Sequence, residues 1–452
     1  FLRGRTSPSV LLAAALLAVL LVDPLAVMSP GFWLSFAAVA VILYALSGAD
    51  AKGWKERLIT WGRLQWAIAA GLLPLLLYLF QQVSLSGPFA NLVAIPVVEL
   101  VVIPATLLGV AGSFFLPDSV AAWPFLLAAK AMAMLWPLLE LLAPVEGSQW
   151  VQHNPPLWTL GAALVGVLLL LAPRGVPARW LGLVWLLPMF LVRPALPAPG
   201  EARVTLLDVG QGLAVVVQTA GHTLVYDTGA RLSARFDAGR AVLVPFLRHA
   251  GVARVDTLIV SHGDNDHIGG STSLRAAMPV TRVLSSVPER LANAEACLSG
   301  QQWVWDGVRF EMLHPDRDSP LTGNNLSCVL RIVSPHGRAL LPGDIAARAE
   351  RAILLEREGQ LAAEVLVVPH HGSKSSSTET FLDTVRPRVA LLPVGYRNRY
   401  HHPHPIVVAR YVERGISLED SATAGAISLR LAAAGLQIDR YRDSQRRYWH
   451  GQ

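Results

Sequence analysis

Long apolar runs fill the first 193 residues, and they restrict what this chain can fold into more than any other feature. A bilayer core of about 30 Å requires ~20 apolar residues per helix, and most of the runs approach that length. A composition that is 53% hydrophobic and 15% charged lies outside the soluble globular range. We therefore predict a polytopic membrane domain over 1–193 with about seven spans. The runs cover residues 9–27, 32–48, 65–82, 89–112, 120–144, 157–172 and 180–193.

Ionisable side chains inside these runs are costly in hydrocarbon and therefore informative. Glu99 lies near the middle of NLVAIPVVELVVIP (91–104), and we expect it to face a polar membrane pathway. Lys130 and Glu140 either face the same pathway or extend from span ends to the interface. Prolines in the fourth and fifth runs allow broken or re-entrant helices there. These are Pro96, Pro104, Pro124 and Pro137.

Basic residues in short loops predict the orientation of the spans. Threading seven spans places all the basic loops on one side, which is the cytoplasmic one. The loop at 145–156 carries Glu146 and no Lys or Arg, and it falls on the other side. An odd number of spans then places the C-terminal half outside the cytoplasm, while a missed or re-entrant span would invert this. The basic residues are Arg3, Arg5, Lys52, Lys55, Arg57, Arg63, Arg174 and Arg179.

The second half is a different kind of protein. Residues 1–200 contain 10 Lys and Arg with 7 Asp and Glu, whereas the rest of the chain contains 28 and 25. The Pro-rich stretch at 194–200 predicts a linker, and 201–452 alternates short β-type runs with helical patterns, which is an α/β layout. Cys297 and Cys328 are either two buried thiols or, if this domain lies outside the cytoplasm, one disulfide.

The strongest chemical signal is SHGDNDHIGG (261–270), which follows the apolar strand-like run VDTLIV (255–260). His262, Asp264, Asp266 and His267 thus emerge together from a strand end. Four nitrogen and oxygen ligands within six residues suit one or two divalent ions.

Three other segments, one before this motif and two after it, have the same form of a strand followed by ligand residues. RALLPGDIA supplies Asp344, VLVVPHHGSKSS supplies His370 and His371, and HTLVYDTGA supplies Asp227. A lone Asp-Gly turn is ordinarily just a turn, but its recurrence with histidines indicates a single metal-binding site.

The HxDxDHxGG, GD and HHGS series resembles the metallo-β-lactamase superfamily over essentially all of 201–440. That resemblance implies a membrane α-helical bundle followed by an α/β domain of the αββα sandwich type, with metals at the strand ends. It assigns one ion to Asp266, His267, Asp344 and one of two histidines, of which His371 is preferred, leaving His370 to contact substrate. Asp264 and NNLSCVL (324–330) stand where the superfamily commonly has histidines, which weakens the other ion site.

LLDVGQG (206–212), the motifs above and the membrane stretches at 29–44 and 87–109 together resemble ComEC-type DNA internalisation proteins. Nearly the whole chain is covered, with both halves in the family's order. Because the chain starts at Phe1, we expect it to be a fragment of a longer protein that has further N-terminal parts.

The resemblance implies hydrolysis of a phosphodiester, with a divalent ion activating water and neutralising the transition state. Asp266 would orient the attacking water and Asp344 would bind or bridge the ions. Replacement of a histidine by Asp264 favours oxygen-preferring ions, so Mn²⁺ becomes an alternative to Zn²⁺.

Further residues are expected to lie around this site, where they contact the substrate or have only a structural role. His402 in RNRYHHPHP (397–405) would protonate the leaving group, or it is a surface-loop histidine. Four loop residues are expected to contact phosphate groups of the substrate, or else they form an ordinary solvated rim. Asp208 and Gln211 are expected to shape the site. The loop residues are Ser373, Lys374, Arg397 and Arg399.

The resulting function hypothesis is an inner-membrane channel that passes single-stranded DNA during natural transformation, with a periplasmic domain that degrades the non-transported strand. The alternatives are a membrane-tethered hydrolase of a small ester, lactam or phosphodiester, and a channel whose metallo domain binds DNA without cleaving it. No GxxxxGK[ST] pattern occurs, so we expect a separate ATP-driven motor and a separate DNA receptor. Membrane lipid and a possible homo-oligomer complete the expected partners.

Overall fold

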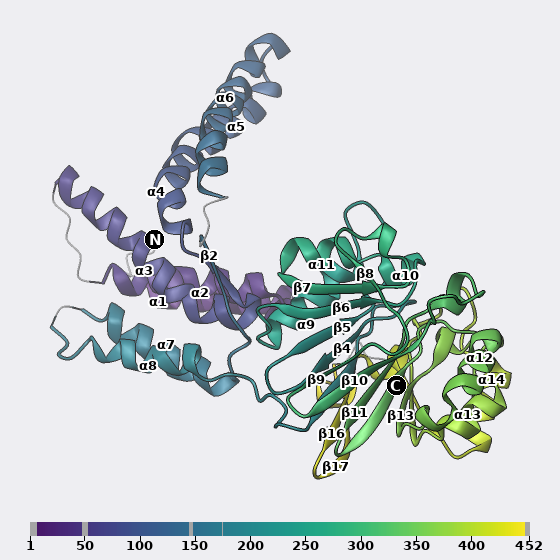
Figure 1. Ribbon diagram of the computed structural model, residues 1–452. Helices are drawn as coiled ribbons and strands as arrows, with labels where there is room; N and C mark the ends of the chain where they lie inside the picture. Colours follow the sequence, from purple (N-terminus) through teal and green to yellow (C-terminus); the bar gives the residue numbers. More distant parts are fainter. Residues whose placement is uncertain (1–6, 48–52, 144–147, 174, 448–452) are drawn as a thin grey trace. The chain divides into compact units, whose positions relative to one another are not determined.

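The computed structural model describes residues 7–47, 53–143, 148–173 and 175–447. It divides into two compact units, residues 1–194 and 195–452 (Figure 1). Arg3, Arg5, Lys52, Glu146 and Arg174, on which part of the orientation argument depends, lie outside the described residues.

The first unit is helical, as its apolar runs predict. Helix α3 packs against α2 and α7, α5 packs against α6, and α7 packs against α8. A π-helical segment, η2 (Val98–Val102), joins α4 to α5, so the helix continues past Pro96. The helices are α1 (Pro8–Val22), α2 (Pro30–Ala45), α3 (Trp54–Phe80), α4 (Gly87–Val97), α5 (Ile103–Ser113), α6 (Asp118–Leu142), α7 (Leu157–Leu171) and α8 (Leu181–Leu191).

Each of the seven predicted apolar runs contains a helical segment, but their lengths differ. Among the described residues, three segments are long and apolar enough to cross a membrane: Trp54–Phe80, Gly87–Ser113 and Asp118–Leu142. The other four, α1, α2, α7 and α8, have only 11 to 16 residues. At 1.5 Å per residue they are about 16–24 Å long, shorter than a ~30 Å hydrocarbon core. The expectation of about seven spans therefore stays a prediction, with three of the spans long enough by helix length.

Two short strands tie the loops at one end of this unit together. β1 (Gln82–Ser84), after α3, pairs antiparallel with β2 (Gln149–Val151), before α7. The segment after β2 also reaches the end of α8, where His153 Nε2 lies 2.6 Å from the carbonyl of Val192. The loops after α3 and α6 and the end of α8 therefore share one end of the unit.

The second unit is a sandwich of two mixed sheets with helices on both outer faces (Figure 1), which confirms the predicted αββα fold. One sheet has the order β17-β16-β3-β4-β5-β6-β7-β8 and the other β15-β14-β13-β12-β11-β10-β9. The strands are β3 (Ala202–Leu206), β4 (Val215–Gln218), β5 (Thr223–Tyr226), β6 (Val255–Val260), β7 (Val280–Ser285), β8 (Glu295–Ala296), β9 (Gln302–Trp305), β10 (Val308–His314), β11 (Val329–Ser334), β12 (Gly337–Leu341), β13 (Val365–Val367), β14 (Val389–Leu392), β15 (Ser417–Asp420), β16 (Ile427–Ala432) and β17 (Gly435–Arg440).

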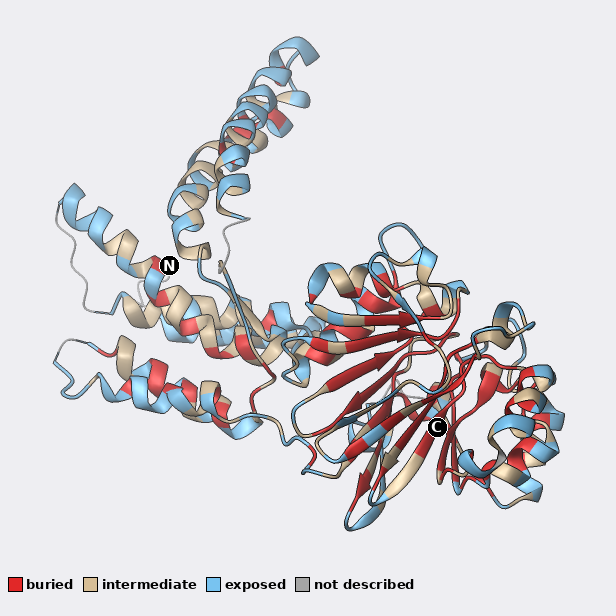
Figure 2. Ribbon diagram, viewed as in Figure 1, coloured by how far each residue is buried: buried red, intermediate tan, exposed pale blue. Residues whose placement is uncertain are grey.

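Three hydrophobic layers hold the sandwich together. Strand β4 shows why: Val215 and Val217 enter the core between the sheets, whereas Val216 enters the core under the helices on the other side. Successive side chains of a strand point to opposite faces, so a strand covered on both sides is apolar throughout. Figure 2 shows these strands buried along their length. The covering helices are α9 (Val244–His249) and α11 (Ser271–Ala277) on one face, and α12 (Ala347–Arg357), α13 (Glu379–Val385) and α14 (Pro405–Glu413) on the other.

A disulfide links the two sheets. Cys297 follows β8 in the first sheet and Cys328 precedes β11 in the second, and the two sulfurs are bonded. Of the two possibilities left open by the sequence, the structure thus has the disulfide.

Candidate metal centre

The metal-binding motifs meet at one edge of the sandwich because parallel strands end there. β5 pairs parallel with β6, and β12 pairs parallel with β13, which pairs parallel with β14. Carboxyl ends of parallel strands share an edge, so the residues that follow these strands converge. The groups delivered in this way are Asp227 after β5, His262 after β6, Asp344 after β12, His371 after β13 and the Pro393 carbonyl after β14, while α10 (Asn265–Ile268) carries Asp266 and His267.

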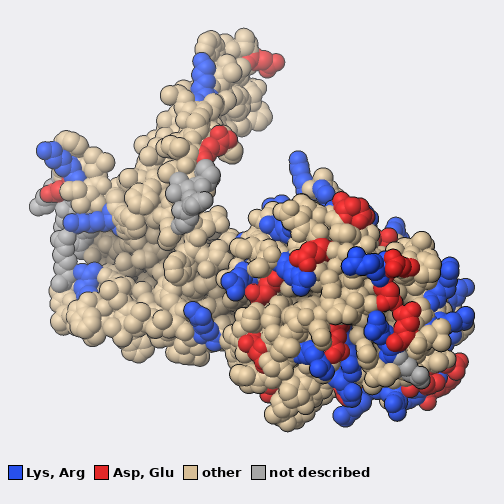
Figure 3. All heavy atoms as spheres, viewed as in Figure 1, with Lys and Arg blue, Asp and Glu red and all other residues tan. Residues whose placement is uncertain are grey.

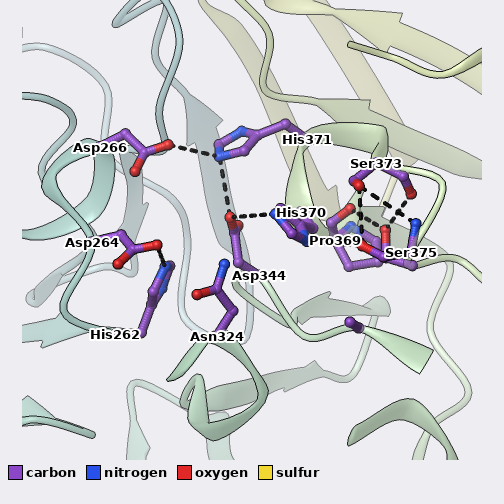
Figure 4. A network of polar contacts seen from close by, with 12 residues as sticks. His262, Asp264, Asp266, Asn324, Asp344, Pro369, His370, His371, Ser373 and Ser375 are labelled. Atoms are coloured by element: carbon purple, nitrogen blue, oxygen red, sulfur yellow. Dashed lines mark hydrogen bonds and ion pairs between the residues drawn. The ribbon is translucent and has the colours of Figure 1, made fainter. Parts of the chain in front are cut away.

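Ligand atoms of four side chains lie close together, and Figure 4 shows three of them, Asp266, Asp344 and His371, facing one another. His371 Nε2 lies 3.3 Å from an Asp266 oxygen and 3.4 Å from an Asp344 oxygen. His267 Nε2 lies 3.3 Å from His371 Nε2 and 3.3 Å from Asp344. Tetrahedral coordination with bonds of about 2.1 Å places ligand atoms about 3.4 Å apart. The ligand atoms of Asp266, His267 and His371 all lie within 4.8 Å of one another, which suits a divalent ion. Asp344 lies beside them and presents Oδ1 to His267 and Oδ2 to His371.

Hydrogen bonds behind the two histidines fix which ring nitrogen faces this point. Asp227 accepts a hydrogen bond from His267 Nδ1 at 2.8 Å, and the Pro393 carbonyl accepts one from His371 Nδ1 at 2.8 Å. Asp227 also accepts bonds from the amide and hydroxyl of Ser261, both at 2.6 Å. When each ring is neutral, its Nε2 carries the free lone pair, as in metal sites whose histidines are oriented by a carboxylate or carbonyl.

A second group of ligand atoms lies beside the first. Ligand atoms of His262, His267 and Asp344 are within 4.8 Å of one another. His262 Nε2 is buried without a hydrogen-bond partner, a costly state that a bound ion would relieve. Asp264 is 3.6 Å from His262 Nε2, but its side chain is 60% exposed. Asn324 is directed towards this group (Figure 4), in the region where the superfamily commonly has a histidine.

Opposite charges are concentrated in this cluster. Burial by itself lowers the pKa of His371, but Asp344 and Asp266 outweigh it and raise that pKa to about 9. Burial likewise disfavours the Asp344 carboxylate, yet His267 and His371 bring its pKa well below its usual value. Burial, followed by repulsion from His267, lowers the pKa of His262, so its ring is neutral and able to act as a ligand. The cluster is therefore built to hold positive charge between ionised carboxylates.

The loop that carries the paired histidines is strained and anchored from behind. His370 and His371 have φ of 50° and 52°, in the left-handed region that non-glycine residues seldom occupy. Buried Glu350 on α12 accepts hydrogen bonds from the amides of Ser377 and Thr378 at 2.5 and 2.9 Å, which holds the end of the loop. This conformation buries His371 in the site and leaves His370 27% exposed at its rim.

The structure places the remaining predicted site residues around this rim. His370 Nε2 lies 3.9 Å from Asp344, and the His402 ring is in edge contact with His370 at 6.3 Å between centroids. Ser375 Oγ lies 3.3 Å from His370 Nδ1. Arg397 and Arg399 are exposed on the loop that leads to His402, and Lys374 is exposed too. Glu99 belongs to the helical unit.

Three residues that orient the site were not assigned that role from the sequence. The sequence pattern places Asp227 with the ligands, but its two carboxylate oxygens accept hydrogen bonds from Ser261 and His267. Ser261 itself was visible as the first residue of SHGDNDH. The Pro393 carbonyl has no sequence signal, because any residue can supply a backbone oxygen.

Comparisons with known proteins match each half of the chain to a protein family. Residues 1–177 match the family described as "Competence protein", and residues 207–396 match the metallo-beta-lactamase superfamily. The chain is 37% identical, over 97% of its length, to "Competence protein ComA" of Neisseria gonorrhoeae, of which it covers 61%. It is 32% identical to "Uncharacterized protein YcaI" of Escherichia coli, with 97% and 58% covered, and 29% identical to "Recombination protein 2" of Haemophilus influenzae, with 93% and 57% covered. The chain thus spans about three fifths of the length of these relatives.

Proposed function

Because the chain belongs to the ComEC-type competence proteins, with a Competence domain followed by a metallo-β-lactamase domain, we propose that it takes part in DNA uptake across the inner membrane in natural transformation. In this proposal the helical unit contributes to a channel for a single strand, and the second unit degrades the other strand. The hydrolytic part of the proposal is supported by two overlapping groups of ligand atoms, each of which suits a divalent ion. One group is Asp266, His267 and His371, and the other is His262, His267 and Asp344.

The chain's own residues have distinct roles in the proposed hydrolysis. A divalent ion, Zn²⁺ or Mn²⁺, supplies Lewis-acid activation of water and charge neutralisation when bound. Asp266, half-exposed at the open side of the cluster, orients the attacking water. His370 would contact the phosphate from the rim. His402, in ring contact with His370, would donate a proton to the leaving oxygen once a bound phosphate offsets the burial that lowers the pKa of His402. Asp227 keeps His267 in the ligating tautomer.

Cationic side chains at the rim favour a phosphodiester over a neutral lactam or ester. Lys374, Arg397 and Arg399 are all exposed next to the loops that carry His370 and His402. Figure 3 shows charged side chains interspersed over the second unit, whereas the helical unit carries fewer of them. A positively charged rim attracts a polyanionic strand and positions its phosphates.

One specific observation supports a second candidate, a domain that binds DNA without cleaving it. Asp264 is 60% exposed and the region of Asn324 lacks a histidine, so the ion site around His262 has fewer ligands than the site around His371. Hydrolysis that requires two ions would fail in such a domain, whereas hydrolysis that requires one would not.

A cleavage assay separates these candidates. The full chain in detergent micelles is incubated with an end-labelled DNA strand, single or annealed, with a chromogenic lactam, or with a thioester, each with Mn²⁺ or Zn²⁺. We expect cleavage of DNA only, abolished by chelator and by Asp266→Ala. The matched control is Asp383→Ala, which removes an exposed carboxylate on α13 that pairs with Arg414, and it should retain activity. Binding without cleavage by the parent protein would favour the second candidate.

We further propose that the second unit is periplasmic. The disulfide between Cys297 and Cys328 favours an oxidising compartment. Lys55 and Arg57 lie in the first turn of α3, at the opposite end of that helix from β1, and the end of α8 lies with β1 and β2. The positive-inside rule then puts the start of the second unit on the outer side. An alkaline phosphatase fused at the C-terminus should be active and a green fluorescent fusion dark, and the reverse would refute this orientation.

Glu99 supports the proposal of a membrane pathway. It lies in the π-helical segment η2, a type of irregularity frequent at functional sites, and is exposed on the helical unit. No ion pair of Glu99 occurs among the described residues. Because a carboxylate facing lipid is costly, we propose that it lines a water-filled path completed by another copy of the chain or by further helices. A separate DNA receptor and ATP-driven motor would deliver and draw the strand.

A further inference from the structure

A loop of alternating tyrosine and arginine lies beside the candidate metal centre, and nothing in the proposed hydrolysis uses its rings. Residues 396–400 read Tyr-Arg-Asn-Arg-Tyr, here called the tyrosine–arginine loop. Tyr396 is 72% and Tyr400 51% exposed. The Arg397 guanidinium lies over the Tyr396 ring at 5.2 Å, and that of Arg399 lies over Tyr400 at 4.9 Å. Two large rings and two cations thus face solvent together.

The backbone of this loop is fixed from inside. The Asn398 side chain donates hydrogen bonds to the carbonyls of Gly395 and His402 and accepts one from the His402 amide. At Gly395 a Cβ would lie 2.6 Å from the amide nitrogen of Gln211, so only glycine allows this close approach. Arg397 has φ of 50°, in the left-handed region that a non-glycine residue keeps only where its surroundings impose it. The exposed side chains are therefore presented on a preorganised support.

A series of ring contacts connects the loop to the metal ligands. Tyr400 lies nearly parallel to His402, with centroids 6.0 Å apart and 17° between planes. His402 contacts His370, whose Nε2 is 3.9 Å from Asp344. A hollow of about 480 Å³ opens here, lined by Tyr396, Arg397 and His402 among others.

We propose that the tyrosine–arginine loop binds an unpaired stretch of the DNA strand next to the bond to be cleaved, an inference that rests on the proposed function and names the form of its substrate. Exposed rings stack on bases, which a single strand offers and a duplex keeps stacked within itself. The guanidinium groups, already ordered on the tyrosine rings, neutralise the adjacent phosphates. A quaternary ammonium ligand such as phosphocholine is disfavoured, because Arg397 and Arg399 would repel it from the same rings.

Binding measured without metal tests this proposal independently of hydrolysis. The full chain in detergent micelles, with chelator present, is titrated into a fluorescent 12-nucleotide thymidine strand and, separately, into a fluorescent 12-base-pair duplex. Tyr396→Ala and Tyr400→Ala should each weaken single-strand binding by roughly 5- to 100-fold and leave duplex binding within about 2-fold, because each removes one base-stacking platform. Tyr396→Phe and Tyr400→Phe keep the rings and should bind as the parent does. Tyr441→Ala, which removes a similarly exposed tyrosine outside the loop, is the control.

The outcomes separate this inference from the proposed function. Equal weakening of both DNA forms, no weakening of either, or no single-strand binding by the parent protein would overturn the role of the loop. If the tyrosine variants lose single-strand binding but the parent cleaves no DNA with any ion, the loop assignment stands and the hydrolysis falls. If the parent cleaves DNA and the tyrosine variants bind as the parent does, only the loop assignment falls.

Discussion

Replacing Asp227 by asparagine tests how the site orients its histidines. Asp227 is fully buried and receives three hydrogen bonds, two from Ser261 at 2.6 Å and one from His267 Nδ1 at 2.8 Å. An asparagine keeps one acceptor oxygen but turns a donating NH₂ towards His267 or Ser261. His267 avoids two facing donors by moving its proton from Nδ1 to Nε2. A protonated Nε2 has no lone pair to offer, so the change reaches the ligand cluster without altering any proposed ligand.

The expected effect is a 10- to 100-fold loss of metal affinity, the range found when such orienting groups are removed, or about 1.4–2.8 kcal/mol. Competition with a chromophoric chelator, on the full chain in detergent, measures it for Zn²⁺ and Mn²⁺. Asp237→Asn is the control, since Asp237 is also buried and accepts bonds from the Arg240 amide and Ser273 hydroxyl but from no proposed ligand. Unchanged affinity in Asp227→Asn, or an equal loss in the control, would refute the orienting role.

Three further changes test other parts of the structure. Joint replacement of Cys297 and Cys328 by serine should lower the unfolding free energy of the second unit by about 3–4 kcal/mol, given a separation of 31 residues, and an unchanged denaturation midpoint would contradict this. Glu350→Ala leaves two buried amides without an acceptor and should cost about 2–4 kcal/mol, whereas a loss within 0.5 kcal/mol would show that water replaces the carboxylate. Glu99→Leu should lower uptake of labelled DNA at normal protein level and leave cleavage intact, and normal uptake would make Glu99 a packing residue.

Much of the second unit could be predicted because its local patterns agree with its tertiary structure. The strand-then-ligand motifs at His262, Asp344 and His371 predict convergence, since parallel strands end at one edge. The helical pattern of STSLRAA (271–277) forms α11 over the same residues. The role of Asp227 could not be read in this way, because ligand and orienting carboxylates differ only in which lone pairs their neighbours occupy.

The helical unit shows a different limit of sequence reasoning. Mean hydropathy detects an apolar run but not where regular helix begins and ends within it. The run at 180–193 contains only the 11 residues of α8, since Val192 is already extended. The run at 89–112 continues as helix past Pro96 and includes the π-helical segment Val98–Val102, which no apolar pattern predicts.

Metal content is the most direct test of the central claim that Asp266, His267, Asp344 and His371 form a divalent-ion site. The full chain and its Asp266→Ala, His267→Ala double variant are loaded with Mn²⁺ or Zn²⁺, freed of loose ions, and analysed by elemental mass spectrometry against protein concentration. We predict one or two ions per parent chain and the loss of at least one in the double variant, with both proteins folded by circular dichroism. Equal metal content in the two proteins, or none in the parent, would contradict the account.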